Sequence, residues 1–426
     1  MSESPLKFSL NAPNWDIVNL KDASVFIKDG THGTHERVLE GIPLLSAKNI
    51  SPLGTITIDD NDSLISEDEY NKIHSKYELK KNDLLITVVG TLGRSALVAS
   101  NKRFSIQRSI GVIRCLEAKV RPEFLYQFTG TDYFQSQLVL RSNATAQAGI
   151  YLGELAKIEV PRPPLPEQKK IAAILSSVDE VIEKTRAQID KLKDLKTGMM
   201  QELLTKGIGH TEFKDSPVGR IPASWNAELL DKVAARGSGH TPSKSQPEYW
   251  NGNVYWVSLS DTNKLDRLYI SATTKQISEL GIQNSSAVLH PPGTVVLSRD
   301  AGIGKSAIIT KEMAVSQHFI AWRCSNHLDN HFLYYILQFW KPKFESIAMG
   351  STIKTIGLPF FKQLHVPLPP ISEQEAIAGA LKSIDLKVFN VKRKLDATMA
   401  VKKALMQDLL TGKVRVNVDA RELADA

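Results

Sequence analysis

One short stretch of the sequence has the residue types of a phosphate-binding loop. Gly302-Ile-Gly-Lys305-Ser306 places a lysine and a hydroxyl directly after a pair of glycines. A phosphate loop needs a further glycine five residues before the Gly-Lys pair, so that backbone N–H groups can surround the phosphates. Position 299 carries Arg instead, and the corresponding stretch Gly93-Arg94-Ser95 has no lysine. The sequence therefore predicts a tight turn between strands rather than a nucleotide site.

Histidines are the second group of residues that could do chemistry, as metal ligands. His32, His35 and His240 lie in polar loops, without paired cysteines and without a helix that carries glutamate. Zinc sites combine such ligands at defined spacings, so these histidines are interpreted as loop donors and no metal site is predicted. The sequence also contains no methyltransferase Asp/Asn-Pro-Pro-aromatic motif, ATPase motif, nucleophile elbow or nuclease carboxylate–lysine cluster. No catalytic residue is predicted.

What remains is a set of polar loops in both halves of the chain. Arg, Lys, Gln, Asn, Ser, Thr and His side chains contact the base edges and phosphates of DNA. For any single residue, an ordinary solvated turn is an equally good interpretation; for the loops as sets, DNA contact is the prediction. The candidate DNA-binding residues are Lys28, Thr31, His32, Lys48, Asn49, Thr91, Arg94, Gln107, Arg108, Arg141, His240, Thr241, Lys244, Arg299, Lys305, Gln317, His318, Ser351 and Lys354.

The elements that position these loops are indicated by an internal repeat. Val160-Pro-Arg-Pro-Pro-Leu-Pro-Glu-Gln168 recurs as Val366-Pro-Leu-Pro-Pro-Ile-Ser-Glu-Gln374, at an offset of 206 residues. The match continues without a gap to Leu203-Leu-Thr205 and Leu409-Leu-Thr411. A period near half of the chain indicates a duplication rather than an array of short repeats.

Each copy of the repeat predicts one long helix. Pro163-Pro164 and Pro369-Pro370 forbid helix upstream, and Gly207, Gly209 and Gly412 lie where a helix stop is expected. Apolar residues recur at steps of three and four over about five heptads, which favours a coiled-coil-like seam. The alternative is two ordinary core helices, but a length of roughly 34 residues is far above the usual ~11–12. The predicted seam is formed by Ile171, Ile174, Leu175, Val178, Val181, Ile182, Ile189, Leu192, Leu195, Met199 and Leu203, and by Ile377, Leu381, Ile384, Val388, Val391, Leu395, Val401, Leu405 and Leu409.

The segments outside the helices are predicted to be two α+β domains of one fold. In the first, one helix is expected from Pro122 to about Arg141, because proline suits the first turn of a helix. Short apolar runs punctuated by Gly, Asn and Asp predict strands at 43–50, 84–89, 95–98 and 110–115. The predicted segments are 1–160 for the first domain, 161–208 for the first long helix, 209–366 for the second domain, and 367–426 for the second long helix and tail.

The second domain repeats the scaffold of the first, while its loop residues differ. Leu92-Gly-Arg-Ser-Ala96 is echoed by Ile303-Gly-Lys-Ser-Ala307, and Gln107 by Gln317. Two domains of one fold with different loops suit the recognition of two different targets. On this alignment Arg299, Lys305, Gln317 and His318 fall near Val88, Arg94, Gln107 and Arg108.

Composition limits the class of protein. Of the 426 residues, 42% are apolar, which is enough for folded cores, and no apolar run approaches the ~18 residues of a membrane span. The first residues lack a signal-peptide pattern. Cys115 and Cys324 are expected to be equivalent buried thiols rather than a disulfide, and a cytoplasmic protein is predicted. A net charge of +7 permits a polyanionic partner without requiring one.

Taken together, the two variable domains and the two repeated helices closely resemble the specificity (S) subunit of type I restriction-modification systems. The resemblance is carried by Pro161 to Gln168, Pro367 to Gln374 and the two Leu-Leu-Thr ends, and it covers nearly the whole chain. It implies an α+β fold with two target recognition domains, each a small β-sheet or barrel with helices. It also implies that two long antiparallel helices separate these domains, with pseudo-twofold symmetry. Each domain would bind one half of a bipartite site in double-stranded DNA.

The resemblance also implies partners and a division of chemistry. Methyltransferase (M) subunits, two by symmetry, would dock on the helices that set the spacing, and restriction (R) subunits would join the full complex. S-adenosylmethionine, ATP and Mg are expected on those partners, so this chain would hold no cofactor and perform no catalysis. The M-docking residues implied in this way are Glu167, Gln168, Leu204, Glu373, Gln374 and Leu410.

Two other classes of protein stay open at this stage. The modest charge leaves room for a scaffold whose repeated domains bind proteins and not DNA; a salt-titrated binding assay with duplex DNA would distinguish it. A self-contained DNA-modifying enzyme is disfavoured by the missing catalytic motifs, and methyl incorporation by the isolated chain would reveal it.

Overall fold

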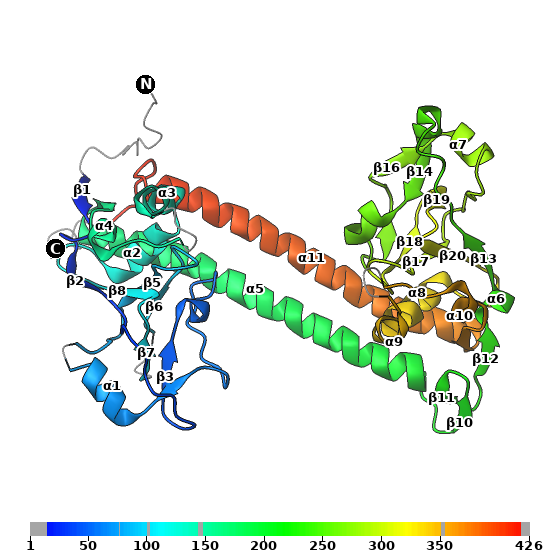
Figure 1. The fold of residues 1–426 in the computed structure, drawn as a ribbon, viewed down its shortest axis with the longest axis horizontal. Coiled ribbons are helices and arrows are strands. Elements are labelled where there is room, and N and C mark those ends of the chain that lie inside the picture. The colour runs from blue at the N-terminus through cyan, green and yellow to red at the C-terminus, as the bar shows by residue number, and fades with distance from the viewer. Residues whose placement is uncertain (1–14, 76, 100–102, 144–147, 351–353, 419–426) are drawn as a thin grey trace. The chain divides into compact units, whose positions relative to one another are not determined.

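The computed structural model describes residues 15–75, 77–99, 103–143, 148–350 and 354–418. The chain divides into two compact units, Met1–Thr185 with Lys394–Ala426, and Arg186–Arg393. These units differ from the four sequence segments because each long helix gives one half to each unit (Figure 1).

The first unit is built around an antiparallel sheet in the order β2–β8–β5–β6. In this order its strands are Ser24–Asp29, Ile110–Cys115, Leu84–Thr87 and Ser95–Leu97. A second sheet contains β4 (Leu64–Ile65), β3 (Ile42–Leu45) and β7 (Ser105–Ile106), with β3 and β7 parallel. β1 (Asp16–Asn19) pairs with β9 (Glu159–Arg162), which leads into the long helix. The helices are α1 (Glu67–Ile73), α2 (Pro122–Thr129), α3 (Asp132–Arg141) and α4 (Leu152–Leu155), with a 3-10 turn at Ala47–Asn49.

The second unit contains the same plan with additional strands. Its main sheet has the order β13–β20–β17–β18–β15, formed by Ala234–Ser238, Phe319–Cys324, Val295–Ser298, Ser306–Ile309 and Tyr269–Ile270. A smaller sheet contains β16 (Lys275–Ile277), β14 (Trp250–Val257) and β19 (Met313–Val315). β12 (Asn226–Leu229) pairs with β21 (His365–Leu368), and β10 (Phe213–Ser216) forms a hairpin with β11 (Gly219–Pro222). The helices are α6 (Leu230–Val233), α7 (Glu279–Gln283), α8 (Asn330–Phe339), α9 (Lys341–Ile347) and α10 (Leu358–Lys362), with 3-10 turns at Pro247–Tyr249 and Leu259–Lys264.

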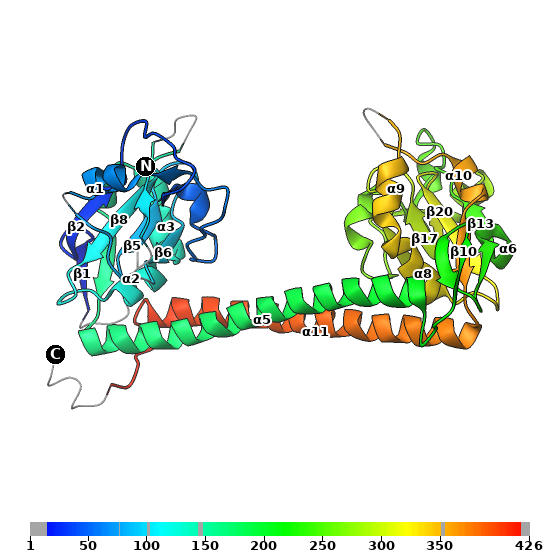
Figure 2. The ribbon, with the colours of Figure 1, turned by 90° about the horizontal axis from the view of Figure 1, so that it is seen from below.

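The repeated helices are α5 (Leu165–Lys206) and α11 (Ile371–Leu409), with 42 and 39 residues. Each helix half packs into the core of its own unit: Ile171 shares a core with Leu409 in the first, and Ile377 packs with Leu203 in the second. The early part of one helix therefore meets the late part of the other, which confirms the predicted antiparallel pairing. Figure 2 shows α2 and α8 beside the long helices.

Three details differ from the sequence predictions. The helix predicted from Pro122 to Arg141 is two helices, because the Thr131 side chain caps a new start by accepting from Phe134 N–H. The strand predicted over 43–50 ends at Leu45, where a 3-10 turn capped at Ser46 begins. Three residues assigned to the helix seam are instead exposed, namely Val181, Leu195 and Val401.

The two cysteines are free thiols at the ends of equivalent strands, β8 and β20. Burial, with a smaller effect of nearby carboxylates, raises the pKa of both Cys115 and Cys324 to about 12. Because the thiolate is the nucleophile, we expect almost no reaction of either thiol with iodoacetamide at pH 8 in the folded protein. Both should react after guanidinium unfolding, which serves as the control. Cys115 is buried and Cys324 is half-buried. Rapid labelling of the native chain, followed by mass spectrometry, would contradict the raised pKa values.

Candidate nucleic-acid interface and helix junctions

The turn β5–β6 in the first unit and the turn β17–β18 in the second have the same backbone hydrogen bonds. Thr87 N–H donates to the carbonyl of Arg94 at 2.8 Å, and Ser298 N–H to that of Lys305 at 2.8 Å. Gly93 and Gly304 both have positive φ, 80° and 77°, which favours glycine there. These are the tight turns that the sequence predicts, and they place Arg94 and Lys305 at equivalent positions.

The neighbouring loop corrects the sequence alignment by one residue. Val88 N–H donates to Ser109 O at 2.9 Å, and Arg299 N–H donates to His318 O at 3.0 Å. His318 is therefore the counterpart of Ser109. The strand registers agree, because Ile110 lies opposite Thr87 and Phe319 lies opposite Ser298. It follows that Gln317 corresponds to Arg108, not to Gln107.

We call the loops 30–35, 88–94 and 106–109 of the first unit, and their counterparts 239–241, 299–305 and 315–318 of the second, the polar edge. In the second unit, Asp300 connects the loops 299–305 and 315–318 of the polar edge. Asp300 is 7% exposed, and its carboxylate pairs with His318 Nδ1 at 2.5 Å. It also accepts a hydrogen bond from the Thr355 hydroxyl, and Arg299 Nε lies 3.6 Å away. On the other side of the same loop, Thr241 Oγ1 donates to Gln317 Oε1.

The polar edge of the first unit is held by different residues. Its Thr31 hydroxyl lies 2.6 Å from His35 Nε2, and His35 Nδ1 lies 2.7 Å from Glu69. Arg94 is half-buried and Arg108 is exposed, and within the described part of the chain neither guanidinium has an ion-pair partner. Among the described residues, the same scaffold therefore presents Arg94 and Arg108 without ion-pair partners in the first domain. In the second domain it presents Gln317, bonded to Thr241, beside the His318–Asp300 pair.

Several predicted DNA-binding residues have partners inside the chain. Asn49 is 2% exposed and donates to Asp62 Oδ2 at 2.8 Å, and Lys48 pairs with Asp62 at 2.8 Å. Burial alone would raise the pKa of Asp62, but the hydrogen bonds from Asn49 and Lys48 outweigh it and the pKa is lowered. These contacts indicate a structural role for Asn49.

The remaining predicted residues lie in varied surroundings. Lys28 Nζ lies 4.7 Å from the centre of the Tyr77 ring, and Lys305 Nζ donates to Thr262 O at 3.3 Å. His32 pairs with Asp29 at 2.6 Å. Ser351 lies outside the described residues. Thr91, Lys244 and Lys354 are exposed, while Gln107, Arg141 and His240 are half-buried.

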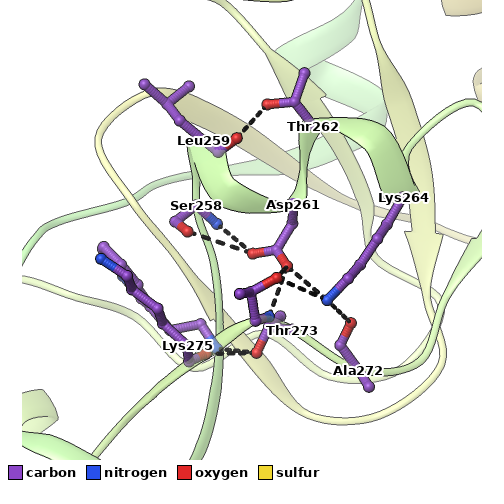
Figure 3. A network of polar contacts seen from close by, with 10 residues as sticks. Ser258, Leu259, Asp261, Thr262, Lys264, Ala272, Thr273 and Lys275 are labelled. Atoms are coloured by element: carbon purple, nitrogen blue, oxygen red, sulfur yellow. Dashed lines mark hydrogen bonds and ion pairs between the residues drawn. The ribbon is translucent and has the colours of Figure 1, made fainter. Parts of the chain in front are cut away.

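A buried carboxylate network in the second domain was not predicted from the sequence (Figure 3). Asp261 is fully buried, caps the turn that begins at Ser258, and occupies the place of Asn49. Its carboxylate accepts from Lys264 Nζ at 2.9 Å and from Thr274 N–H at 2.6 Å. The Ser-x-x-Asp spacing is the signal in the sequence, since a side chain three residues on can bond back to the cap.

The Glu-Gln pairs that open the long helices are junctions within each unit. Glu167 is 3% exposed and accepts from Trp15 Nε1 at 2.8 Å and from Arg415 Nε at 2.6 Å. Glu373 accepts in the same way from Trp225 Nε1 at 3.0 Å, and His210 Nε2 lies 2.8 Å from it. Each glutamate therefore ties the first tryptophan of a domain to the helix that follows the domain.

The glutamines next to them make a matching set of bonds. Gln168 donates to Lys119 O and Pro163 O and accepts from Arg121 N–H. Gln374 donates to His327 O and Pro369 O and accepts from Asp329 N–H. Both glutamines are 0% exposed. Of the residues predicted to dock M subunits, Glu167, Gln168, Gln374, Leu204 and Leu410 are buried, and Glu373 is largely so.

A second repeated junction joins the two helices to each domain. In the first unit, Asp179 pairs with Lys402 at 2.6 Å and accepts from Gln127 of α2 at 2.8 Å. In the second, Asp385 pairs with Lys196 at 2.6 Å and accepts from Tyr335 of α8 at 2.9 Å. Burial and the Asp385 charge raise the pKa of Tyr335, which keeps its hydroxyl a donor. The identical residues of the repeat thus fix each domain on the helix pair.

Neither a metal cluster nor a membrane span occurs in the described part of the chain. No group of three His, Cys, Asp or Glu side chains there is placed to hold a metal ion. No described helix has both the length and the apolar content needed to cross a membrane.

Comparison with known proteins assigns both halves of the chain to one family. Residues 16–194 and 222–397 match the family described as type I restriction modification DNA specificity domain. The chain is 28% identical to the putative type I restriction enzyme MjaX specificity subunit of Methanocaldococcus jannaschii, over 95% of this chain and 94% of that protein. Identity is 27% to the MjaVIII specificity subunit of the same organism, over 95% and 93%. The crystal structure of a type I restriction-modification S subunit from M. genitalium has a TM-score of 0.58 at 16% identity, covering 96% of this chain and 98% of that one.

Because the family matches most of the chain, the protein belongs to the specificity subunits of type I restriction-modification systems, which are non-catalytic components of those complexes. The S-subunit structure supports the fold: two α+β domains separated by long helices that pack together.

Proposed function

We propose that each domain binds one half of a bipartite DNA site through its polar edge. The observation that carries this proposal is the shared backbone of the two edges. Equivalent positions hold Val88 and Arg299, Arg94 and Lys305, Arg108 and Gln317, and Ser109 and His318. A fixed scaffold with different side chains at the same points suits the recognition of two different sequences by one kind of surface.

Arg108→Ala and Arg299→Ala are expected to act on different halves of the site. An arginine on a base edge contributes ~1–3 kcal/mol of discrimination, so each variant should relax one half-site and leave the other unchanged. The experiment is to co-express each full chain with its M partner and sequence the methylated sites. Thr57→Ala, outside the polar edge, is the control that should keep the wild-type motif. If both arginine variants alter the same half, one domain does not bind one half-site.

We infer further that the long helices dock two M subunits and set the spacing between half-sites, with R subunits in the full complex. S-adenosylmethionine, ATP and Mg would be bound by those partners. Since most of the residues first predicted for docking are buried, their part would be to hold the helix ends in place. Leu195 and Val401, at the same position of the repeat, are 52% and 55% exposed and offer apolar contact instead. A shallow depression of about 420 Å³ adjoins the first, lined by Leu195, Gly198, Met199, Gln201, Glu202 and Leu203.

Leu195→Asp is expected to remove one M subunit from the complex. A carboxylate would have to lose its water when an apolar partner surface covers it, which is strongly unfavourable. Native mass spectrometry should then show complexes with one M subunit, and Leu195→Asp with Val401→Asp should show none. The matched control is Thr197→Asp, an exposed position about 200° further around the helix. Full M occupancy in the double variant would show that docking occurs elsewhere.

A further inference from the structure

We propose that Gln317 and Arg108, which occupy one backbone position in the two domains, select an adenine in the second half-site and a guanine in the first. The proposal rests on the proposed function and extends it to named bases. Arg108 directly precedes Ser109, whose carbonyl accepts from Val88 N–H in the turn that holds Arg94. Gln317 directly precedes His318, whose carbonyl accepts from Arg299 N–H in the turn that holds Lys305. Arg108 and Gln317 are both exposed. The two side chains therefore leave their domains at the same point of the polar edge.

The chemistry of Gln317 fits adenine. Thr241 Oγ1 donates to Gln317 Oε1, and the described residues supply no other hydrogen bond to this side chain. This bond turns one end of the amide toward Thr241, and it leaves N–H donors and an acceptor lone pair of the amide available. An oriented amide with one acceptor and one donor side by side matches adenine N6–H and N7 in the major groove. Because Thr241 holds the amide before DNA arrives, little side-chain entropy is lost on binding.

The chemistry of Arg108 fits guanine. A guanidinium presents parallel N–H donors, which match the O6 and N7 acceptors of guanine. No carboxylate of the described chain pairs with it. A phosphate contact would also suit an arginine, but the same position in the second domain holds an uncharged amide. Charge neutralisation of the DNA backbone is therefore not what the two domains share at this position. An uncharged amide can still bond to a phosphate oxygen, so the exchange of side chains below distinguishes a base contact from a phosphate contact.

The experiment exchanges the two side chains. Full chains carrying Gln317→Arg or Arg108→Gln are assembled with the M partner, and methylation is measured on DNA with every half-site position randomised. Gln317→Arg should change one adenine of the second half-site to guanine, with a preference of about five- to 150-fold, and leave the first half-site as it was. Arg108→Gln should make the opposite change in the first half-site. Thr241→Val should keep the motif but reduce discrimination at the same single position.

Two further measurements keep the outcomes distinct. Gln317→Ala should leave that position degenerate, with complex assembly checked by native mass spectrometry. If Gln317→Arg and Gln317→Ala both leave the motif unchanged, or both abolish methylation of every sequence in an assembled complex, the assignment of a base to Gln317 is wrong. If the wild-type complex instead methylates without a bipartite motif, the proposed function itself fails.

Discussion

Replacing Gln374 by leucine is expected to destabilise the second unit by about 2–4 kcal/mol, because three backbone groups lose their partner at once. The side chain is 0% exposed, donates to His327 O and Pro369 O, and accepts from the N–H of Asp329. Asp329 is the N-cap of α8, so the glutamine ties the start of α11 to the start of α8. Leucine has a similar size, and the loss is therefore of hydrogen bonds rather than of volume.

The measurement is hydrogen exchange followed by mass spectrometry, since two units with separate cores need not unfold together. Peptides from α8 and β21 should exchange faster in Gln374→Leu, while peptides of α2 and β9 keep their wild-type protection. Gln168→Leu should give the reverse pattern, because Gln168 accepts from the N-cap of α2 in the same way. Gln407→Leu, at an exposed position of α11, is the control. Uniform loss of protection across both units would contradict local anchoring.

The architecture was predictable from the sequence because repeated residues carry it. The repeat at an offset of 206 residues indicates the duplication, and the prolines before each helix and the glycines after it are local signals of where a helix begins and ends. The structure confirms the two long helices. The role of Glu167 and Gln168 was not predictable in the same way. A glutamate and a glutamine on a helix suggest an exposed face, and nothing local reveals that Trp15 and Lys119 cover them.

The correspondence between polar-edge residues of the two domains was also not predictable from the sequence. The alignment matched Gln107 with Gln317 because the residues are identical, whereas the hydrogen-bond ladder matches Arg108 with Gln317. Loop side chains are free to change, so identity there is a weaker guide than strand pairing. In a similar way, recurrence of Asp179 and Lys196 as Asp385 and Lys402 was visible, but their pairing across the helices needed the antiparallel arrangement.

The contacts of the described tail residues after Thr411 predict that a chain ending at Thr411 will have a less stable first domain, while the stability of its second domain is unchanged. Arg415 donates to both oxygens of Glu167 at 2.6 and 3.0 Å, although 248 residues separate them in the chain, and its guanidinium lies 5.8 Å from the centre of the Trp15 ring. Val416 packs against the same core. Without the tail, the buried Glu167 carboxylate keeps, among the described residues, only its bond from Trp15. Because the Arg415 side chain is 42% exposed, the loss is expected to be about 2–3 kcal/mol rather than the ~3–5 of a fully buried pair.

Two truncations separate this contact from the mere loss of residues. A chain ending at Val418 keeps every tail contact described above and should match the full chain, whereas a chain ending at Thr411 should expose the first unit to faster hydrogen exchange. Arg415→Ala should reproduce part of that change, and Arg415→Lys less of it, because an ammonium cannot bond both carboxylate oxygens as a guanidinium does. The second unit should be unaffected, because Glu373 receives the N–H of Ile208 and pairs with His210 from the segment after α5. In an assembled complex, the Thr411 truncation should weaken discrimination in one half-site only, the half that Arg108→Ala also relaxes. Weakening of the other half, or equal loss in both truncations, would show that the tail does not hold the first domain.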